Sequence, residues 1–407
     1  MLTIAAVFAL SSFVVIEPSP FDFAVLALAF FLLWALRPPT HPDLLLPVAM
    51  LGAYALFTVI AAMSATDIPE MALFMGVTFF LVLVGVFVCC LVATWPQAAH
   101  AVLAGYCLSS VISTALSLAV VAGLLPLDIV MYDASRVQAF FKDPNVYGPS
   151  LVLSILYLLM LLEQAPRRLF QSVALVAALL MLVLGVLYSA SRAAWMNLAL
   201  SLVVYIALRS WTARGAEAIR FWGLMIAACG AIAIGSAVVV TVSGFETFMD
   251  ERVGLQDYDA DRFGAQEEGL EAAFAAPLGG GPGQFESHVG VLGISAHSLY
   301  IRTMMENGLP GFFALMMFFA LTLLVALRSV RAGGRFSGLS AVVTASLLGA
   351  LANGLFVDTL HWRSLWIQAG LAWGLYAVCL QHAGTQMSHS VITRPVKHHC
   401  STGSGAV

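Results

Sequence analysis

The sequence predicts an all-α polytopic membrane protein with about twelve transmembrane helices and one long extramembrane loop that contains short helices. Mean hydropathy is +0.95, and charged residues make up only 10% of the 407 positions. Soluble domains carry roughly a quarter charged residues, so the composition excludes an ordinary soluble fold. Apolar runs close to the ~20 residues that span a bilayer recur along the chain. Helices suit these runs because they satisfy their backbone hydrogen bonds internally.

The apolar runs divide the chain into four parts. Residues 1–242 hold nine expected spans, residues 243–308 form the long loop, residues 309–382 hold three further spans, and residues 383–407 form a polar tail that we expect to be disordered. The expected spans cover residues 2–16, 21–36, 44–63, 71–93, 101–123, 148–162, 169–188, 194–208, 221–242, 309–327, 340–357 and 365–380.

Lysines and arginines predict the orientation of these spans. Alternate short loops carry most of them, and loops of this kind face the cytoplasm. The residues concerned are Arg37, Arg167, Arg168, Arg209, Arg214, Arg220, Arg328, Arg331 and Arg335. Both termini are then cytoplasmic, and the long loop, which carries most of the acids, lies on the outer side.

Several cations lie on the outer side, against this rule. They are Arg136, Lys142, Arg192, Arg252, Arg262, Arg302 and Arg363. Each could pair with a lipid phosphate or a neighbouring carboxylate. A shared anionic ligand would explain the whole set, because the planar fork of arginine suits phosphate and diphosphate oxygens.

The stretch 279–311 contains the clearest polar motif. Its first glycines, from Gly279 to Gly283, can adopt positive φ and allow another chain or a ligand to approach the backbone. Ser298 is positioned to cap a short helix that ends near Asn307, with Gly308 as its C′ residue and Pro310 blocking continuation.

His297 would lie beside the positive end of this short helix, which favours the neutral imidazole that can accept a proton. A purely structural hydrogen bond within the loop is the alternative role for His297. His288 is the nearest competing histidine.

A second helix is expected over residues 262–276, on the membrane surface. Phe263, Leu270, Ala273 and Phe274 share one face, and Pro277 ends the helix. Asp259 and Asp261 are placed to cap its start. Together with Asp257 they could also hold a divalent cation, but the outer arginines could neutralise the same phosphates, so we expect no metal and no cofactor.

The polar motifs together resemble those of the O-antigen ligase and polysaccharide polymerase superfamily of bacterial inner-membrane proteins. The resemblance rests on Arg136 followed by Asp143-Pro144-Asn145, on the short loop with Ser191-Arg192, on Arg262 ahead of Pro277, and on His297-Ser298 followed by Gly308-Leu-Pro-Gly311. It extends from about Arg136 to Gly311.

The resemblance implies an inverting, metal-independent glycosyltransferase in the bacterial inner membrane, with its active site in the periplasmic loop. The donor is a glycan on undecaprenyl diphosphate. The acceptor is lipid A–core in a ligase, or a second lipid-linked glycan in a polymerase. Membrane lipids are expected partners and nucleic acids are not. Arg192, Arg262 and His297 match the family's functional residues, and Arg136 matches an earlier outer-loop arginine.

Chemistry points to the same residues. Cationic groups aimed at a leaving diphosphate stabilise the charge that develops on it. We expect Arg192 and Arg262 to clamp the diphosphate and His297 to orient or deprotonate the acceptor hydroxyl. Further expected substrate-binding residues are Arg136, Asn145, Arg302, Gly281 and Gly283. The alternative function is a polytopic transporter of a polar or anionic substrate, which would place ionisable residues or helix breaks near mid-membrane.

Overall fold

The computed structural model describes residues 1–133, 136–164, 168–241, 257–288, 295 and 297–392. These residues form α-helices, two short 3₁₀ helices and connecting turns, with no β-strand in the described ranges. The α-helices are α1 Leu2–Phe8, α2 Pro20–Leu32, α3 Leu45–Ala62, α4 Ile68–Thr94, α5 Ala98–Val121, α6 Pro144–Glu163, α7 Leu169–Tyr188, α8 Arg192–Thr212, α9 Ala216–Thr241, α11 Asp257–Ala275, α12 Phe285–His288, α13 Leu299–Ala332, α14 Ser337–Asn353 and α15 Arg363–Ile392.

Seven helices of the described chain are long and apolar enough to cross a membrane, and they are α3 to α8 and α13. The shorter apolar helices α2 and α14 coincide with two more expected spans. The all-α polytopic membrane fold predicted from composition is therefore confirmed. Seven spanning candidates, counted only over the described residues, are fewer than the twelve expected from the apolar runs.

The first expected span is wrong. Helix α1 has 7 residues, which at about 1.5 Å per residue cannot cross a hydrocarbon core of about 30 Å. After Phe8 the chain turns, and the backbone N–H of Ser12 donates to Ser109 Oγ at 2.9 Å instead of continuing a helix. At the other end, α15 continues to Ile392, past residue 383, where the tail was expected to begin. Residues 393–407 lie outside the described residues.

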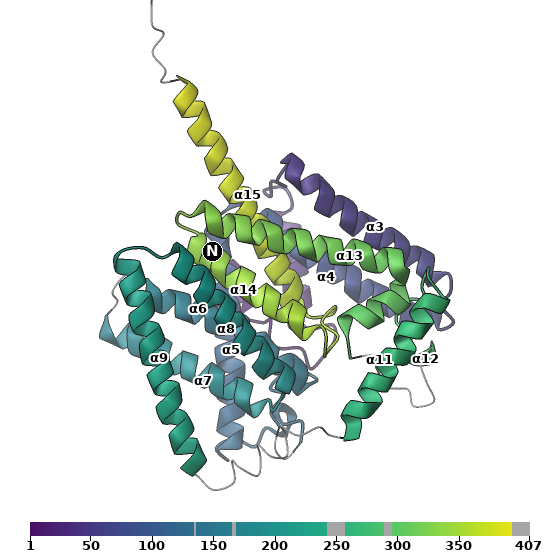
Figure 1. Cartoon of the computed structure of the whole chain (residues 1–407), viewed down its shortest axis with the longest axis horizontal. Helices are drawn as coiled ribbons and strands as arrows, with labels where there is room; N and C mark the ends of the chain where they lie inside the picture. Colours follow the sequence, from purple (N-terminus) through teal and green to yellow (C-terminus); the bar gives the residue numbers. More distant parts are fainter. Residues whose placement is uncertain (134–135, 165–167, 242–256, 289–294, 296, 393–407) are drawn as a thin grey trace, which may run out of the picture.

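The helices form two adjoining groups (Figure 1). One contains α3, α4, α13 and α15, in which α4 packs along α15 and α3 along α13. The other contains α5 to α8, and α14 packs against α8 and joins the groups. Gly370 and Gly374 lie on one face of α15, where a Cβ would clash with Gly85 and Val92 of α4. Small residues spaced four apart allow this close helix approach.

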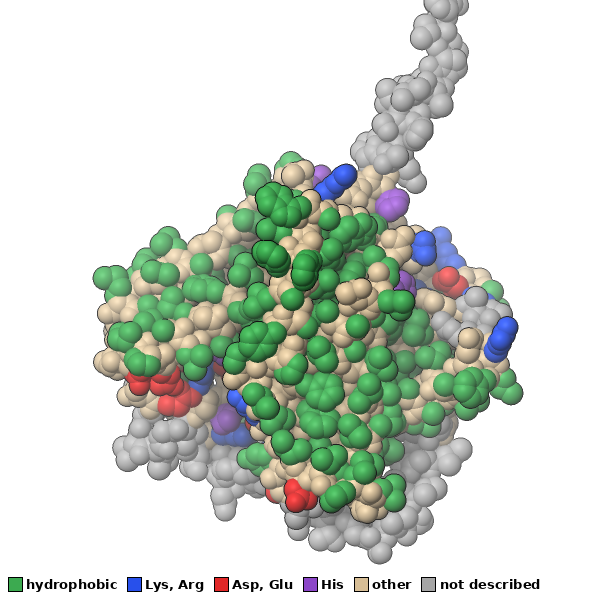
Figure 2. Space-filling model, turned by 180° about the vertical axis from the view of Figure 1, so that it is seen from behind, with side chains coloured by type: hydrophobic (Ala, Val, Ile, Leu, Met, Phe, Trp, Pro, Cys, Tyr) green, Lys and Arg blue, Asp and Glu red, His purple; other side chains and the backbone are tan. Residues whose placement is uncertain are grey.

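Hydrophobic side chains cover most of the face seen in Figure 2, and charged side chains gather towards its edges. Large apolar residues on the outer faces of the helices are exposed, among them Phe30, Phe31, Leu73, Leu169 and Phe170. Exposed apolar surface of this extent would be unusual on a soluble monomer, and it fits contact with lipid.

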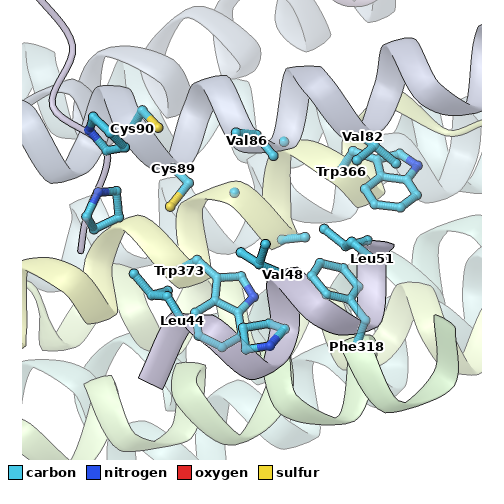
Figure 3. A pocket seen from close by; sticks show the side chains of 16 residues that line it. Leu44, Val48, Leu51, Val82, Val86, Cys89, Cys90, Phe318, Trp366 and Trp373 are labelled. Carbon is cyan, nitrogen blue, oxygen red and sulfur yellow. The ribbon is translucent and has the colours of Figure 1, made fainter. Parts of the chain in front are cut away.

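An apolar cavity of about 160 Å³ lies between α3, α4 and α15 (Figure 3). Leu44, Val48 and Leu51 come from one side, Val82 and Val86 from α4, and Trp366 and Trp373 from α15. No charged side chain lines it. A cavity of this kind suits a hydrocarbon chain and offers nothing for acid–base chemistry.

Candidate functional site

Helix α13 is interrupted where the sequence predicts a break. Gly308 has φ 71° and ψ 170°, so residues 299–307 form a short helix of their own before the long one continues. Ser298 occupies the N-cap position in extended conformation, although its hydroxyl donates to Gly354 O instead of capping the helix. A Cβ at Gly308 would lie 2.5 Å from the carbonyl carbon of Leu278. Glycine is therefore required here both for its conformation and for space.

The glycine-rich turn packs against the chain's own backbone. Gly279, Gly281 and Gly283 have φ values of 99°, 111° and 72°. A Cβ on Gly281 would meet Ala65 at 2.9 Å, and one on Gly283 would meet Phe74 at 3.0 Å. Of the two expected reasons for the glycines, approach of another chain segment accounts for both without a ligand.

Gln284 fixes this turn to the start of α4. Its side-chain oxygen accepts hydrogen bonds from Thr66 N at 3.1 Å, Thr66 Oγ1 at 3.0 Å and Asp67 N at 2.9 Å. Asp67 in turn caps α4 by accepting from Glu70 N at 3.0 Å. One buried side chain therefore couples the loop before α13 to the α3–α4 connection.

Arg302 is surrounded by carboxylates. Its guanidinium pairs with Glu286, with Glu306 at 3.8 Å and with Asp358 at 3.4 Å, and it lies over the rings of Phe74 and Phe285. Glu306 is fully buried. These contacts fit a structural role in which Arg302 holds the loop onto the bundle through ion pairs. They favour this role over the expected contact with substrate.

Two further outer cations also have carboxylate partners. Lys142 pairs with Glu17 at 2.7 Å, and Arg363 donates two hydrogen bonds to Asp22 at 2.9 and 2.7 Å. Local pairing therefore accounts for them without a shared anion. Arg252 and residues 289–294 lie outside the described residues, as does the side chain of His288.

Three helices begin close together at one end of the bundle. Asp143 caps α6 by accepting from Asn145 N at 2.7 Å, and Ser191 caps α8 by accepting from Ala194 N at 3.3 Å. A Cβ on Gly148 of α6 would lie 2.7 Å from Ala194. The charge of Asp143, which caps α6, also reaches His297 just before α13, so α13 begins at the same end. The partial positive charges of three helix N-termini therefore point into one region.

Arg136 lies at this end, and its backbone N–H donates to the carboxylate of Asp133 at 2.8 Å. Its Nε donates to Ser189 O and its terminal nitrogen donates to Asn145 Oδ1, both at 3.3 Å. The guanidinium also lies 5.4 Å from the centre of the Tyr132 ring. The structure thus brings together Arg136, Asn145 and the loop that leads to Arg192.

Arg192 is the first residue of α8, and it follows Ala190, which has φ 48°. Arg262 projects from α11, which starts at Asp257. Both side chains are half-buried and make further interactions within the chain. Arg192 thus comes from the start of a long helix, and Arg262 comes from a helix within the long loop.

His297 sits directly before the short helix, with φ 43°. This left-handed backbone is uncommon for a side chain other than glycine and marks a constrained position. Burial lowers the pKa of His297 below its usual range, and the nearby charges of Arg262 and Arg302 lower it further, while Asp143 and Glu286 oppose them. The imidazole is therefore neutral near pH 7, as expected, although burial is the main cause.

Helix α11 differs in part from the expected surface helix. It begins at Asp257, so Asp259 and Asp261 lie within its first turns and do not cap it as expected. Their side chains lie outside the described part of the chain. Phe263, Leu270 and Phe274 are exposed as the predicted apolar face requires, whereas Ala273 is buried on the opposite flank against a cluster with Phe285 and Met305.

Sequence reasoning missed the role of Asp143 and of the α14–α15 loop. Asp143 appeared only as part of a turn, yet its charge acts on His297. Asp358 and His361 in the loop had no motif, but Asp358 pairs with Arg302, and His361 Nε2 lies 2.8 Å from Thr78 Oγ1. Within the described ranges, no group of three His, Cys, Asp or Glu residues is arranged to hold a metal ion.

Comparison with known proteins gives one family match. Residues 176–316 match the family described as O-antigen ligase. The matched segment contains Arg192, Arg262 and His297, and it ends beyond the break at Gly308. No curated protein matches the chain. The resemblance to the O-antigen ligase superfamily seen in the motifs is therefore confirmed over residues 176–316.

Proposed function

We propose that this protein transfers a glycan from undecaprenyl diphosphate to an acceptor hydroxyl at the outer face of the bacterial inner membrane. The family match supports membrane glycan transfer in general. The donor, the acceptor and the side of the membrane are part of the proposal. Both termini are then cytoplasmic, and the end of the bundle where α6, α8 and α13 begin is periplasmic.

One observation carries the proposal. A half-buried imidazole lies close enough to the cation of Arg262 for that charge to lower its pKa, at the end of the bundle where three helix N-termini meet. A neutral base beside a strongly positive region is the arrangement that glycosyl transfer from a diphosphate requires. The base serves the incoming hydroxyl, and the positive region serves the leaving group.

The reaction is a single displacement. The acceptor oxygen forms a bond to the anomeric carbon while the bond from that carbon to the diphosphate oxygen breaks, which inverts the configuration. The acceptor proton passes to His297, which later releases it to solvent. The electron pair of the broken bond stays on the diphosphate, whose growing charge Arg136, Arg192 and Arg262 stabilise together with the helix N-termini.

The other expected residues have supporting roles. Asn145 orients Arg136 through its side-chain oxygen. Arg302 does not contact the diphosphate in this scheme, because three carboxylates already surround it. Gly281 and Gly283 allow the loop to fold tightly onto the α3–α4 connection and α4, and they have no direct contact with substrate in this scheme.

The acceptor is either lipid A–core, for a ligase, or a second lipid-linked glycan, for a polymerase. A deletion strain separates the two. Loss of all long-chain lipopolysaccharide with lipid-linked chains retained identifies a ligase, whereas single repeat units in place of chains identify a polymerase.

A vesicle assay tests the proposal directly. Purified protein is reconstituted with an undecaprenyl-diphosphate-linked glycan, and transfer to each acceptor is measured for Arg136→Lys, Arg192→Lys, Arg262→Lys and His297→Asn. Each lysine variant keeps the charge but loses the bidentate fork, so a roughly 10- to 100-fold loss is expected. Arg331→Lys, at the junction of α13 and α14, is the matched control and should transfer normally. Wild-type rates in all four variants would rule out the proposed site, and uptake of a solute with no transfer would favour the transporter.

A further inference from the structure

A second cavity, of about 240 Å³, lies beside the start of α6. It lies between the non-helical segment after α1, the first turns of α6 and the loop between α14 and α15. Its lining includes Ser11, Glu17, Phe141, Lys142, Asp358 and Trp362. All of these side chains lie within the described residues, and none has a role in the transfer step proposed above.

The cavity and the His297 region share a wall. Lys142 lines the cavity, and the next residue, Asp143, is one of the charges that act on His297. On another side, Asp358 lines the cavity and pairs at 3.4 Å with Arg302, whose charge also reaches His297. The cavity is therefore linked to the surroundings of the imidazole through Asp143 and through the pair of Asp358 with Arg302.

The lining has the chemistry of a carbohydrate site. Phe141, Tyr106 and Trp362 provide aromatic surface for the C–H faces of a sugar, and the carboxylates of Glu17 and Asp358 can accept hydrogen bonds from its hydroxyls. Its volume is below the roughly 300–1,000 Å³ of sites for drug-sized ligands, which suits one sugar ring and not a chain.

Ser11 gives independent support for a polar ligand. Ser11 lines the cavity, the residue is only 4% exposed, and its buried Oγ has no hydrogen-bond partner among the described residues. Buried hydroxyls are normally paired, so an unpaired one that lines a cavity indicates a partner that arrives with a ligand.

The charges favour the acceptor over the donor. Both cations of the lining have carboxylate partners, since Lys142 pairs with Glu17 and Arg363 with Asp22. A diphosphate would gain little electrostatic stabilisation from cations that are already paired, and the carboxylate of Asp358 would repel it. The sugar attached to the diphosphate must stay beside the arginines of the active site, so a separate cavity with carboxylate walls suits a sugar of the acceptor.

We propose that this cavity binds one sugar ring of the glycan acceptor and so positions its hydroxyl for attack. The inference rests on the proposed function and deepens it. Ser11, Glu17 and Asp358 would contact the hydroxyls of that ring, and Phe141 and Trp362 would pack against its faces. These residues determine acceptor affinity and take no part in the bond-making step.

Ser11→Ala is the sharpest test, because it removes a hydroxyl that makes no bond within the described chain and so leaves the fold intact. Transfer in vesicles is measured while the acceptor, lipid A–core or a second lipid-linked glycan, is titrated at a fixed donor concentration. In a second series the donor is titrated at a fixed acceptor concentration. We expect the KM for the acceptor to rise roughly 3- to 10-fold, with the KM for the donor and kcat unchanged. Glu17→Gln should raise the same KM roughly 10-fold or more.

Ser340→Ala is the matched control. Ser340 of α14 is also buried with an unpartnered hydroxyl, but it does not line the cavity, so this variant should behave as wild type.

The possible outcomes separate this inference from the proposed function. An unchanged acceptor KM in both Ser11→Ala and Glu17→Gln, with a wild type that transfers glycan, would overturn the sugar cavity and leave the function standing. A rise in the donor KM alone would overturn the assignment to the acceptor. A wild type that transfers no glycan to either acceptor would refute the function itself.

Discussion

The side-chain oxygen of Gln284 accepts a hydrogen bond at 2.9 Å from the backbone N–H of Asp67, and it thereby ties the loop before α13 to the first turn of α4. The same oxygen accepts from both donors of Thr66. The glycine-rich turn is therefore held by a contact between segments separated by more than half of the chain.

Gln284→Ala should destabilise the protein by about 1–3 kcal/mol, because it leaves several donors in a partly buried region without an acceptor. Thermal unfolding in detergent would measure the change. Gln284→Glu keeps an oxygen in the same place and should cost less. Gln138→Ala, which removes a single exposed hydrogen bond to Ile129 O, serves as the control and should cost much less. An unchanged unfolding midpoint for Gln284→Ala would contradict the anchoring role.

Replacement of His297 should separate activity from folding. Asparagine tolerates the left-handed backbone that this position adopts, so His297→Asn should fold and melt like the wild type. Loss of the proposed base should reduce kcat by roughly 10²- to 10⁴-fold. The comparison is His100→Asn. His100 lies in the first turn of α5, near the end of α13 and away from its start, so this variant should retain full transfer. If His297→Asn transfers glycan at a normal rate, the imidazole is structural.

The pH profile should move in opposite directions in two variants. The pKa of His297 is lowered, so the neutral base persists below pH ~6.5 and activity falls only when the pH drops through that lowered value. Arg262→Gln removes a cation that disfavours the imidazolium, so it should raise the pKa and move the acid limb of kcat/KM to higher pH.

Asp143→Asn removes a charge that favours the imidazolium and should move the acid limb to lower pH. Asparagine caps a helix as well as aspartate does, so α6 should keep its start. Acid limbs that coincide in the wild type and both variants would show that His297 does not control the pH dependence.

Loss of Arg302 should impair folding, whereas loss of Arg136 should not. Arg302→Met leaves Glu306 buried without its cation, a change that typically costs about 3–5 kcal/mol. Arg136→Met removes hydrogen bonds to two neutral oxygens and should fold while losing transfer. The yield of monodisperse protein after size-exclusion chromatography and the vesicle assay distinguish the two. The reverse pattern would exchange the structural and functional assignments of these arginines.

Two glycines with the same φ provide a matched test of the break in α13. Gly308 and Gly333 both have φ 71°, but a Cβ would clash with Leu278 only at Gly308 and would meet nothing within 4 Å at Gly333. Gly333→Ala should cost only the ~1–3 kcal/mol of a backbone with positive φ and ψ −155°. Gly308→Ala adds roughly 1–3 kcal/mol of overpacking. Equal unfolding midpoints for the two variants would mean that the contact at Leu278 is not tight.

The sequence predicted correctly those features that depend on neighbouring residues or on overall composition. The break at Gly308 followed from a glycine two residues before a proline, and composition was enough for the membrane class. The sequence could not separate the arginines that pair with carboxylates from those available to a substrate, because ion pairing depends on tertiary contacts. Arg363 meets Asp22 across 341 positions, and no pattern of spacing indicates such a pair. The length of α1 was missed because the segment after Phe8 is apolar enough to span.

The convergence of the beginnings of α6, α8 and α13 has a lasting electrostatic effect. Each start contributes partial positive charge, roughly half an elementary charge, from peptide amides that no change of pH can neutralise and no side-chain replacement can delete. An anion held at this end should consequently keep a residual affinity in acid, in alkali and after loss of any single guanidinium. The surrounding side chains are then free to vary with the sugar while the backbone continues to attract the phosphates.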